Sequence, residues 1–286
     1  MRIPRLARTV VVLFALSLVL LSFGAPASAL PLGGLGLGPG AGNWSLGGEA
    51  CRLIETPTVR TAAPVAVLGS CPGVRPGAIV ESDAGQCTFN FVYAGTDGLT
   101  YIGTAGHCIL GDDGETSWAP GSGPEARDGA GNRIGEFAYA VLEDPKDFSL
   151  IRVDAGVPVD PQMCHFGGPT GVNSDMPSGP VVLQHFGNGI GLGLVLPGRS
   201  AVALGMPDPD HVFAEGVVVP GDSGSGITSS DGRAVGVIVT TGIHIAGLGT
   251  SGIDAGLMGV TRLAPQLARA TQVTGVGYSI VTAPSL

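Results

Sequence analysis

The sequence predicts an all-β protein that carries one helix near its C-terminus. Glycine contributes 49 of the 286 residues and proline 22, and both divide the chain into short runs rich in valine, isoleucine and aromatic residues. Runs bounded by glycine or Asp-Gly are typical of hairpin strands. Residues 261–270 instead have helical spacing, because Leu263 and Leu267 are four apart and Pro265 stands early, where proline is tolerated.

The first 29 residues have the pattern of an export signal. Three arginines precede the apolar run 10–21, and the small residues Ala27-Ser28-Ala29 fit a cleavage site. The run is shorter than the roughly 18–20 residues that a membrane-spanning helix needs. An uncleaved membrane anchor is the alternative. We expect residues 1–29 to be removed and the protein to be secreted, without a membrane partner.

Residues 30–78 read as a Gly/Pro-rich N-terminal extension or a short pro-segment. Residues 30–48 carry too little side-chain volume to build a core. Residues 49–78 contain Cys51 and Cys71 within a stretch rich in threonine, alanine and proline. The main folded domain is therefore expected to span residues 79–286.

The strand-like runs of this domain fall into two groups. The first comprises residues 87–93, 99–102 and 133–139, and the second comprises residues 179–183, 190–196 and 234–239. The stretch 158–161 begins and ends with proline and reads as the linker between them. About 200 residues remain after the N-terminal extension, which is enough for a sizeable core.

The charge of the chain excludes some partners. The formal net charge is −9, and removing the signal's three arginines from the 14 basic residues leaves 11 against 23 acidic ones. An acidic chain without a basic patch argues against nucleic acid or an anionic membrane as a partner.

Two short motifs carry chemistry. Ser223 stands in Gly221-Asp222-Ser223-Gly224-Ser225-Gly226, and His107 stands in Thr104-Ala105-Gly106-His107-Cys108. A serine becomes a strong nucleophile when an imidazole takes its proton. The flanking glycines allow a tight turn that brings the N–H groups of Gly221 and Ser223 to one point, where an oxyanion could be held. The alternative is a Gly/Asp/Ser turn without chemistry.

The imidazole needs a carboxylate to fix its tautomer. Asp147 is the strongest candidate, because the apolar run Phe148-Ser149-Leu150-Ile151 follows it and would bury it. Asp144 and Asp154 are the competitors. The order His107, Asp147, Ser223 differs from the Ser, Asp, His order of the α/β-hydrolases.

On these motifs and their order, the chain resembles the chymotrypsin-like (trypsin-like) serine peptidases, particularly the secreted bacterial branch of the streptogrisins and α-lytic protease. The resemblance implies two six-stranded antiparallel β-barrels with the active site between them. The first barrel would span about residues 79–157 and the second about 162–262. A C-terminal helix and tail would occupy residues 261–286.

The chain has five cysteines, so at least one lacks a partner within it. The resemblance implies a disulfide between Cys87 and Cys108. Nearness along the chain suggests Cys51 with Cys71. Bacterial relatives have a cysteine soon after the segment that corresponds to Thr170-Gly171, but this chain does not, so Cys164 is expected to be unpaired.

The resemblance also points to a substrate pocket. Its base is expected at Val217, six residues before the nucleophile, and its wall at Val239, Thr240, Thr241 and Gly242. An uncharged base offers no counter-charge to arginine or lysine, and Ile238 stands near where glutamate-specific relatives have histidine. We therefore expect a small or apolar side chain before the scissile bond, unless insertions shift this alignment.

In bacterial relatives an arginine pairs with the aspartate before the nucleophile. The matching segment here gives His165, so we hypothesise that protonated His165 pairs with Asp222 and that its pKa is raised. The alternative is that another arginine, such as Arg133, fills this role.

Together these features predict a secreted, monomeric serine endopeptidase that acts on protein or peptide substrates without a cofactor. No Cys/His spacing near Cys164 and His165 supports a metal site. Two other classes remain open: a catalytically silent binding protein on the same scaffold, and a Gly-rich wall-associated protein.

Overall fold

The computed structural model describes residues 71–175, 180–189, 196–205, 209–242 and 257–286. The expected signal segment, the stretch 30–70 and Cys51 lie outside the described residues, as does the run 190–195. Within the described ranges no helix is both long and apolar enough to cross a membrane.

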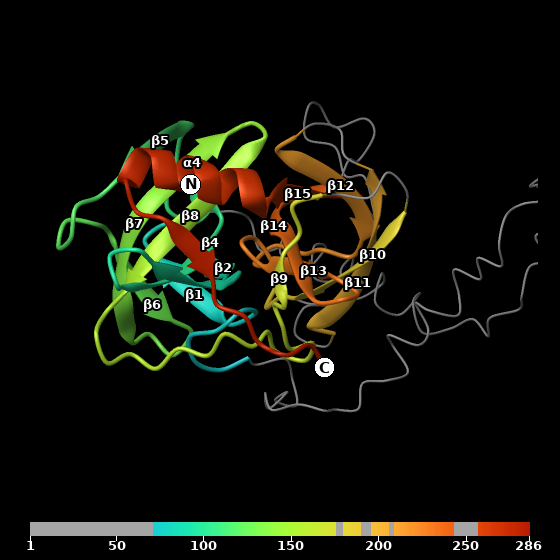
Figure 1. Cartoon of the computed structure of the whole chain (residues 1–286), viewed down its shortest axis with the longest axis horizontal. Helices are drawn as coiled ribbons and strands as arrows, with labels where there is room; N and C mark the ends of the chain where they lie inside the picture. Colours follow the sequence, from blue (N-terminus) through green and yellow to red (C-terminus); the bar gives the residue numbers. More distant parts are fainter. Residues whose placement is uncertain (1–70, 176–179, 190–195, 206–208, 243–256) are drawn as a thin grey trace, which may run out of the picture. The chain divides into compact units, whose positions relative to one another are not determined.

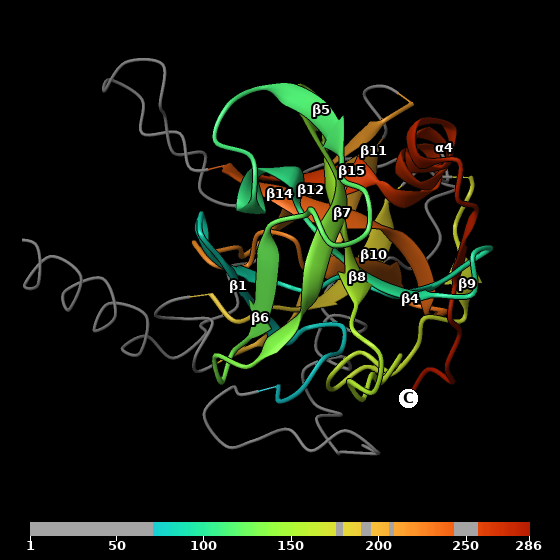
Figure 2. The same cartoon turned by 90° about the vertical axis from the view of Figure 1, so that its left-hand side faces the viewer.

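Nine antiparallel strands form the first sheet (Figure 1). They are β1 (Ile79–Ser82), β2 (Gly85–Thr88), β3 (Val92–Gly95), β4 (Thr100–Thr104), β5 (Gly114–Ser117), β6 (Glu125–Asp128), β7 (Arg133–Glu143), β8 (Lys146–Val153) and β16 (Tyr278–Ile280). Their order is β16-β3-β4-β8-β7-β6-β1-β2, and β5 pairs with β7. Figure 2 looks onto β6, β7 and β8 of this curled sheet.

Seven strands form the second sheet. They are β9 (Gly171–Val172), β10 (Val181–Phe186), β11 (Gly198–Gly205), β12 (His211–Gly216), β13 (Gly226–Ser229), β14 (Arg233–Gly242) and β15 (Leu257–Arg262). The order β13-β10-β11-β12-β15-β14 closes into a six-stranded barrel because β13 also pairs with β14. Among the described strands of this sheet, β9 lies outside the barrel and pairs with β14 in the parallel direction. The all-β prediction is confirmed.

The described residues form two hydrophobic cores, and the first also includes side chains of β10 and β14 from the second sheet. The first is rich in fully buried aromatic side chains, among them Phe89, Tyr93, Phe137 and Phe148. The core inside the barrel is built from smaller aliphatic residues, such as Leu183 and Ile227. Burying one such side chain contributes about 1.5–3 kcal/mol, so both sheets are held mainly by the alternating apolar residues that the sequence pattern reveals.

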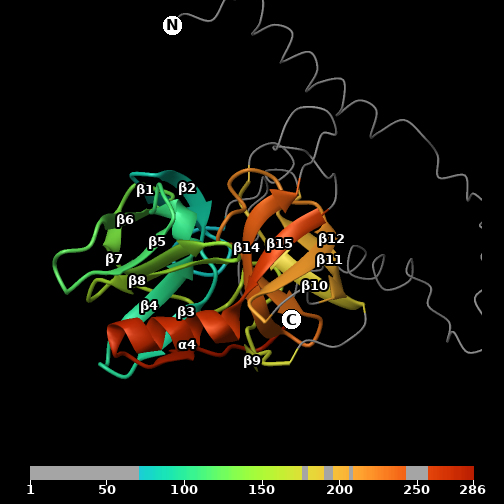
Figure 3. The ribbon, with the colours of Figure 1, turned by 90° about the horizontal axis from the view of Figure 1, so that it is seen from above.

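Helix α4 (Leu263–Thr274) is the C-terminal helix, and in Figure 3 it runs from β15 along the first sheet. It begins two residues later than the predicted segment 261–270 because β15 continues to Arg262. It ends four residues later, at Thr274, and the next residue, Gly275, takes the left-handed conformation that favours glycine at a helix end (φ 73°).

The disulfides correct two expectations. Cys87 is bonded to Cys108, with 6.2 Å between Cα atoms, as the resemblance implies. Cys71 is bonded to Cys164 with a Cα separation of 6.0 Å, so the Cys51–Cys71 pairing and the unpaired Cys164 were both wrong. Nearness along the chain misled because the entropy of closing a loop grows only slowly with its length.

The folded unit also begins earlier than residue 79. Cys71, Val74 and Ala78 are buried, and the N–H of Phe89 donates to the carbonyl of Ala78 over 2.9 Å. The last eight residues of the expected extension, 71–78, therefore pack as part of the fold.

We predict that replacing Cys71 and Cys164 together by alanine lowers the free energy of unfolding by about 4 kcal/mol. The bond joins residues 93 positions apart, so removing it frees a long loop in the unfolded chain. Urea unfolding of the parent and the double variant measures the difference. Non-reduced peptide mapping should recover Cys71 linked to Cys164, and a peptide linking Cys51 to Cys71 would contradict this pairing.

Candidate active site

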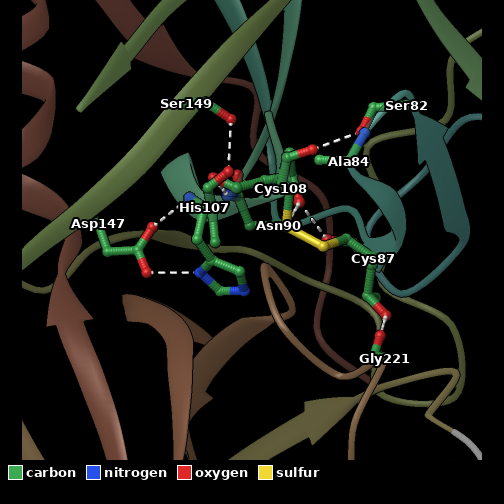
Figure 4. Close-up of a disulfide and its surroundings, with 12 residues drawn as sticks. Ser82, Ala84, Cys87, Asn90, His107, Cys108, Asp147, Ser149 and Gly221 are labelled. Atoms are coloured by element: carbon green, nitrogen blue, oxygen red, sulfur yellow. Dashed lines mark hydrogen bonds and ion pairs between the residues drawn. A yellow bond between two sulfur atoms is a disulfide. The ribbon is translucent and has the colours of Figure 1, made fainter. Parts of the chain in front are cut away.

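His107 and Asp147 meet on the first sheet. His107 lies in a short 3-10 helix, η1 (Gly106–Cys108), and Asp147 lies near the start of β8. The Nδ1 atom of His107 is 2.6 Å from Oδ2 of Asp147, and the backbone N–H of His107 donates to Oδ1 over 2.9 Å. Figure 4 shows the carboxylate directed at the imidazole. This two-point contact fixes the orientation of the ring.

A close approach of η1 to β7 makes this contact possible. A Cβ atom at Gly106 would overlap the backbone carbonyl of Val141, so glycine is required at that position. The side chain of Asp147 is 11% exposed and that of His107 is 32% exposed. The Nδ1 edge of the imidazole is thus covered by the carboxylate, while part of the ring remains exposed.

The competing carboxylates lie elsewhere. Asp144 is exposed in the turn between β7 and β8, and Asp154 accepts a hydrogen bond from Arg133 Nε over 2.8 Å. Among the described carboxylates, Asp147 is the one that the structure brings to His107.

Ser223 lies in the turn that precedes β13, held against the first sheet. Its carbonyl accepts a hydrogen bond from the N–H of Thr88 over 2.8 Å, and the hydroxyl of Thr88 donates to the carbonyl of Gly221 over 2.8 Å. Gly224 has a φ of +87°, and a Cβ atom there would overlap Thr104 and the carbonyl of Thr88. The nucleophile turn therefore packs directly on the segment that leads into His107.

The side chain of Ser223 forms no hydrogen bond within the described part of the chain. The backbone N–H groups of Gly221 and Ser223 likewise donate to no acceptor among the described residues. Two unused donors on either side of Asp222 are what an oxyanion site requires.

A buried ion pair holds this turn, and it corrects the His165 hypothesis. Asp222 is completely buried, and its Oδ1 accepts from Arg199 Nη2 over 2.6 Å. The same oxygen accepts from the N–H of Gly189, and Oδ2 accepts from the N–H of Val219, each over 2.8 Å. Arg199 on β11 therefore fills the role that was given to His165.

His165 lies against the ring of Phe166, with 4.7 Å between centroids. Burial lowers its pKa instead of raising it, so the pH dependence expected from a His165–Asp222 pair does not follow. Arg133, the alternative partner, binds Glu125 and Asp154 at the surface. His165 was therefore the wrong partner of Asp222, and the alternative that another arginine fills the role is confirmed, with Arg199 in place of Arg133.

Arg199 could have been noticed in the sequence. It alternates with Ala201 and Ala203 on β11, both of which are buried in the barrel core. An arginine on the inward-facing side of a strand needs a carboxylate, because an unpaired buried charge is costly. Its cross-strand neighbour His185 is fully buried, and burial, followed by the charge of Arg199, places the pKa of that imidazole well below its usual value.

A metal is not suited to the site. Cys87, His107 and Cys108 lie close enough together to suggest one, but both sulfur atoms belong to a disulfide, and a metal needs thiolates. The disulfide instead supports the His107 turn, as Figure 4 shows.

The expected substrate pocket is only partly described. Val217 follows β12 and is 48% exposed. Thr240, Thr241 and Gly242 lie on β14, opposite Gly259, Met258 and Leu257 of β15. The neighbouring segments 190–195 and 243–256 lie outside the described residues, so the pocket stays a prediction.

No protein-family model matches the chain, and no curated protein does. Solved structures do. The Cellulomonas bogoriensis chymotrypsin has a TM-score of 0.48 at 18% identity, covering 73% of this chain and 98% of its own. The Nocardiopsis protease NAPase has a TM-score of 0.47 at 18% identity, covering 72% and 98%. The alpha-lytic protease homolog N4 has a TM-score of 0.46 at 20% identity, also covering 72% and 98%.

We predict that Arg199→Met lowers the free energy of unfolding by about 3–5 kcal/mol, because it leaves the carboxylate of Asp222 buried and without its cation. Urea unfolding at neutral pH measures the loss. Arg133→Met is the matched control: it removes a surface arginine with two carboxylate partners and should change stability little. Equal losses in the two variants would contradict the role of Arg199.

Proposed function

We propose that this chain is a secreted serine endopeptidase in which Ser223 is the nucleophile, His107 the general base and Asp147 the orienting carboxylate. The observation that carries the proposal is the 2.6 Å contact between His107 Nδ1 and Asp147 Oδ2, and the packing of the Ser223 turn on Thr88 supports it. This combination is the arrangement that acyl transfer needs.

In the proposed reaction, Ser223 Oγ attacks the peptide carbonyl carbon while His107 Nε2 takes the hydroxyl proton. The carbonyl oxygen becomes an oxyanion, which accepts hydrogen bonds from the N–H groups of Gly221 and Ser223. The C–N bond then breaks as the imidazolium gives its proton to the leaving amine. Water, deprotonated by His107, attacks the acyl-enzyme, and Ser223 leaves with its proton restored.

Asp147 stays ionised throughout and stabilises the imidazolium. Its carboxylate accepts both the ring and the backbone donor of His107, so the tautomer with a proton on Nδ1 is selected. That tautomer leaves Nε2 with a lone pair for the proton of Ser223.

Secretion is part of the proposal. The N-terminal signal pattern supports it, and two disulfides fit an oxidising compartment. The expected substrates are proteins or peptides, and the expected state is a monomer. A catalytically silent binding protein is the competing function, but a silent protein has no need for an imidazole oriented by a carboxylate.

We predict that Ser223→Ala and His107→Ala each reduce peptide hydrolysis by at least about 10⁴-fold without unfolding the protein. Casein hydrolysis and labelling by a fluorophosphonate measure the loss. Ser122→Ala, at an exposed serine, is the control and should label like the parent. Hydrolysis by Ser223→Ala at the parent's rate would exclude this assignment, and a parent that does not label would favour the silent binding protein.

We also predict that small or apolar side chains precede the scissile bond, because Val217 offers no charge at the inferred pocket base. Digestion of a peptide library, followed by sequencing of the products, measures the preference. Val217→Asp should shift cleavage towards arginine and lysine by supplying a counter-charge. A parent digest dominated by cleavage after arginine, lysine or glutamate would contradict the assignment of Val217.

A further inference from the structure

Asp147 follows directly on the tip of the hairpin between β7 and β8, residues 143–146. The register of this hairpin places Leu142 opposite Asp147 and Glu143 opposite Lys146. The position of the carboxylate therefore depends on where this hairpin tip lies. Two side chains from outside the first sheet hold the tip: Thr261 and Arg269.

Thr261 is completely buried on β15, in the second sheet. Its hydroxyl donates to the carbonyl of Pro145 over 2.7 Å, two residues before Asp147. The bond thus crosses from the barrel to the hairpin of the other sheet. A side-chain hydroxyl is needed for this contact, because the backbone of Thr261 is engaged in pairing with β12 and β14.

Through the second sheet, Thr261 is also linked to the Ser223 turn. Thr261 lies opposite Val237 on β14. The next residue, Ile238, accepts a hydrogen bond from the N–H of Gly224 over 2.7 Å and donates one to the carbonyl of Ser225 over 2.9 Å. A continuous series of hydrogen bonds and strand pairs therefore links the Ser223 turn to the hairpin that carries Asp147.

Arg269 supplies a second contact with the same hairpin. Helix α4 continues directly from β15, and the guanidinium of Arg269 binds both oxygens of Glu115 over 2.7 and 2.9 Å. It also reaches Glu143 over 3.1 Å. Tyr139 donates to Glu115 over 2.6 Å. The β15–α4 unit thus holds the tip from two directions.

We propose that Thr261 is a positioning residue: its hydroxyl fixes the Asp147 hairpin at a set distance from the Ser223 turn, with Arg269 as a second support. This inference rests on the proposed function. Ser223 and Asp147 belong to different sheets, so their separation depends on bonds that cross between the sheets. Misplacing a reacting group by about 1 Å can cost about 100-fold in rate, which makes such a bond matter for turnover.

The test compares Thr261→Val, Thr261→Ser and Thr228→Val. Valine keeps the shape of threonine and removes only the hydroxyl, so we expect kcat to fall about tenfold with KM unchanged. Serine restores the donor and should recover kcat to within about twofold. Thr228 is equally buried, and its hydroxyl bonds within the second sheet, to Gln184, so Thr228→Val should keep the parent's kcat.

A second measurement does not depend on turnover. The proton between His107 Nδ1 and Asp147 should give a low-field NMR signal in the parent, because a short charge-assisted hydrogen bond deshields it. We expect this signal to shift or broaden in Thr261→Val and to be unchanged in Thr228→Val. Should Thr261→Val fail to fold, Arg269→Gln tests the same hairpin from the helix, with an expected two- to threefold loss of kcat and the same shift or broadening of the signal.

The outcomes separate the inference from the proposed function. An active parent whose kcat and low-field signal survive Thr261→Val would overturn the role of Thr261 and leave the peptidase intact. An inactive parent whose signal shifts or broadens only in the Thr261→Val and Arg269→Gln variants would overturn the peptidase and leave the positioning role intact. A fall in kcat that Thr261→Ser does not recover would also overturn the role, because it would assign the effect to packing.

Discussion

The shape of the nucleophile turn depends on the buried carboxylate of Asp222. A charge without solvent requires both a cation and hydrogen-bond donors. Arg199 supplies the cation, and the N–H groups of Gly189 and Val219 supply donors. These partners come from three separate segments. The carboxylate therefore links β11, the segment that follows β10 and the Ser223 turn. Moving any one of these segments away from Asp222 would remove a partner of the buried carboxylate.

The residues of the proposed triad are divided between the two sheets. His107 and Asp147 belong to the first sheet and Ser223 to the second, so neither sheet holds a complete set. Thr88 connects them through its backbone N–H and its hydroxyl, which reach Ser223 and Gly221. The first hydrophobic core extends to Phe186, Val237 and Val239 of the second sheet, so apolar packing also holds the two sheets together. Short polar contacts that cross from one sheet to the other add directional restraints to this packing.

Local patterns revealed more of this protein than long-range pairings. The helix, the His107 and Ser223 motifs and some of the strands could be predicted because a few neighbouring residues encode each of them, whereas β12 and β15 lie on no predicted strand. The partner of Asp222 was missed, because Arg199 lies 23 residues away and its signal was the weak one of alternating with Ala201 and Ala203 on one strand. The Cys71–Cys164 disulfide was missed for the same reason, because its two cysteines are 93 residues apart in the sequence. Thr261 appeared in the sequence only as part of a helix start, because its contact with Pro145 exists only once both sheets have formed.

The donors of the turn show why an ionised aspartate suits this position better than an apolar residue. The backbone N–H groups with a partner in the described structure belong to Val219, Asp222, Gly224 and Ser225. Pro220 has no N–H to place, which leaves those of Gly221 and Ser223 without an acceptor. Gly221 can take its φ of +98° because it lacks a side chain. The carboxylate accepts hydrogen bonds from the N–H of Val219 and the guanidinium of Arg199, so in the proposed reaction the two remaining N–H groups would bind the substrate oxygen.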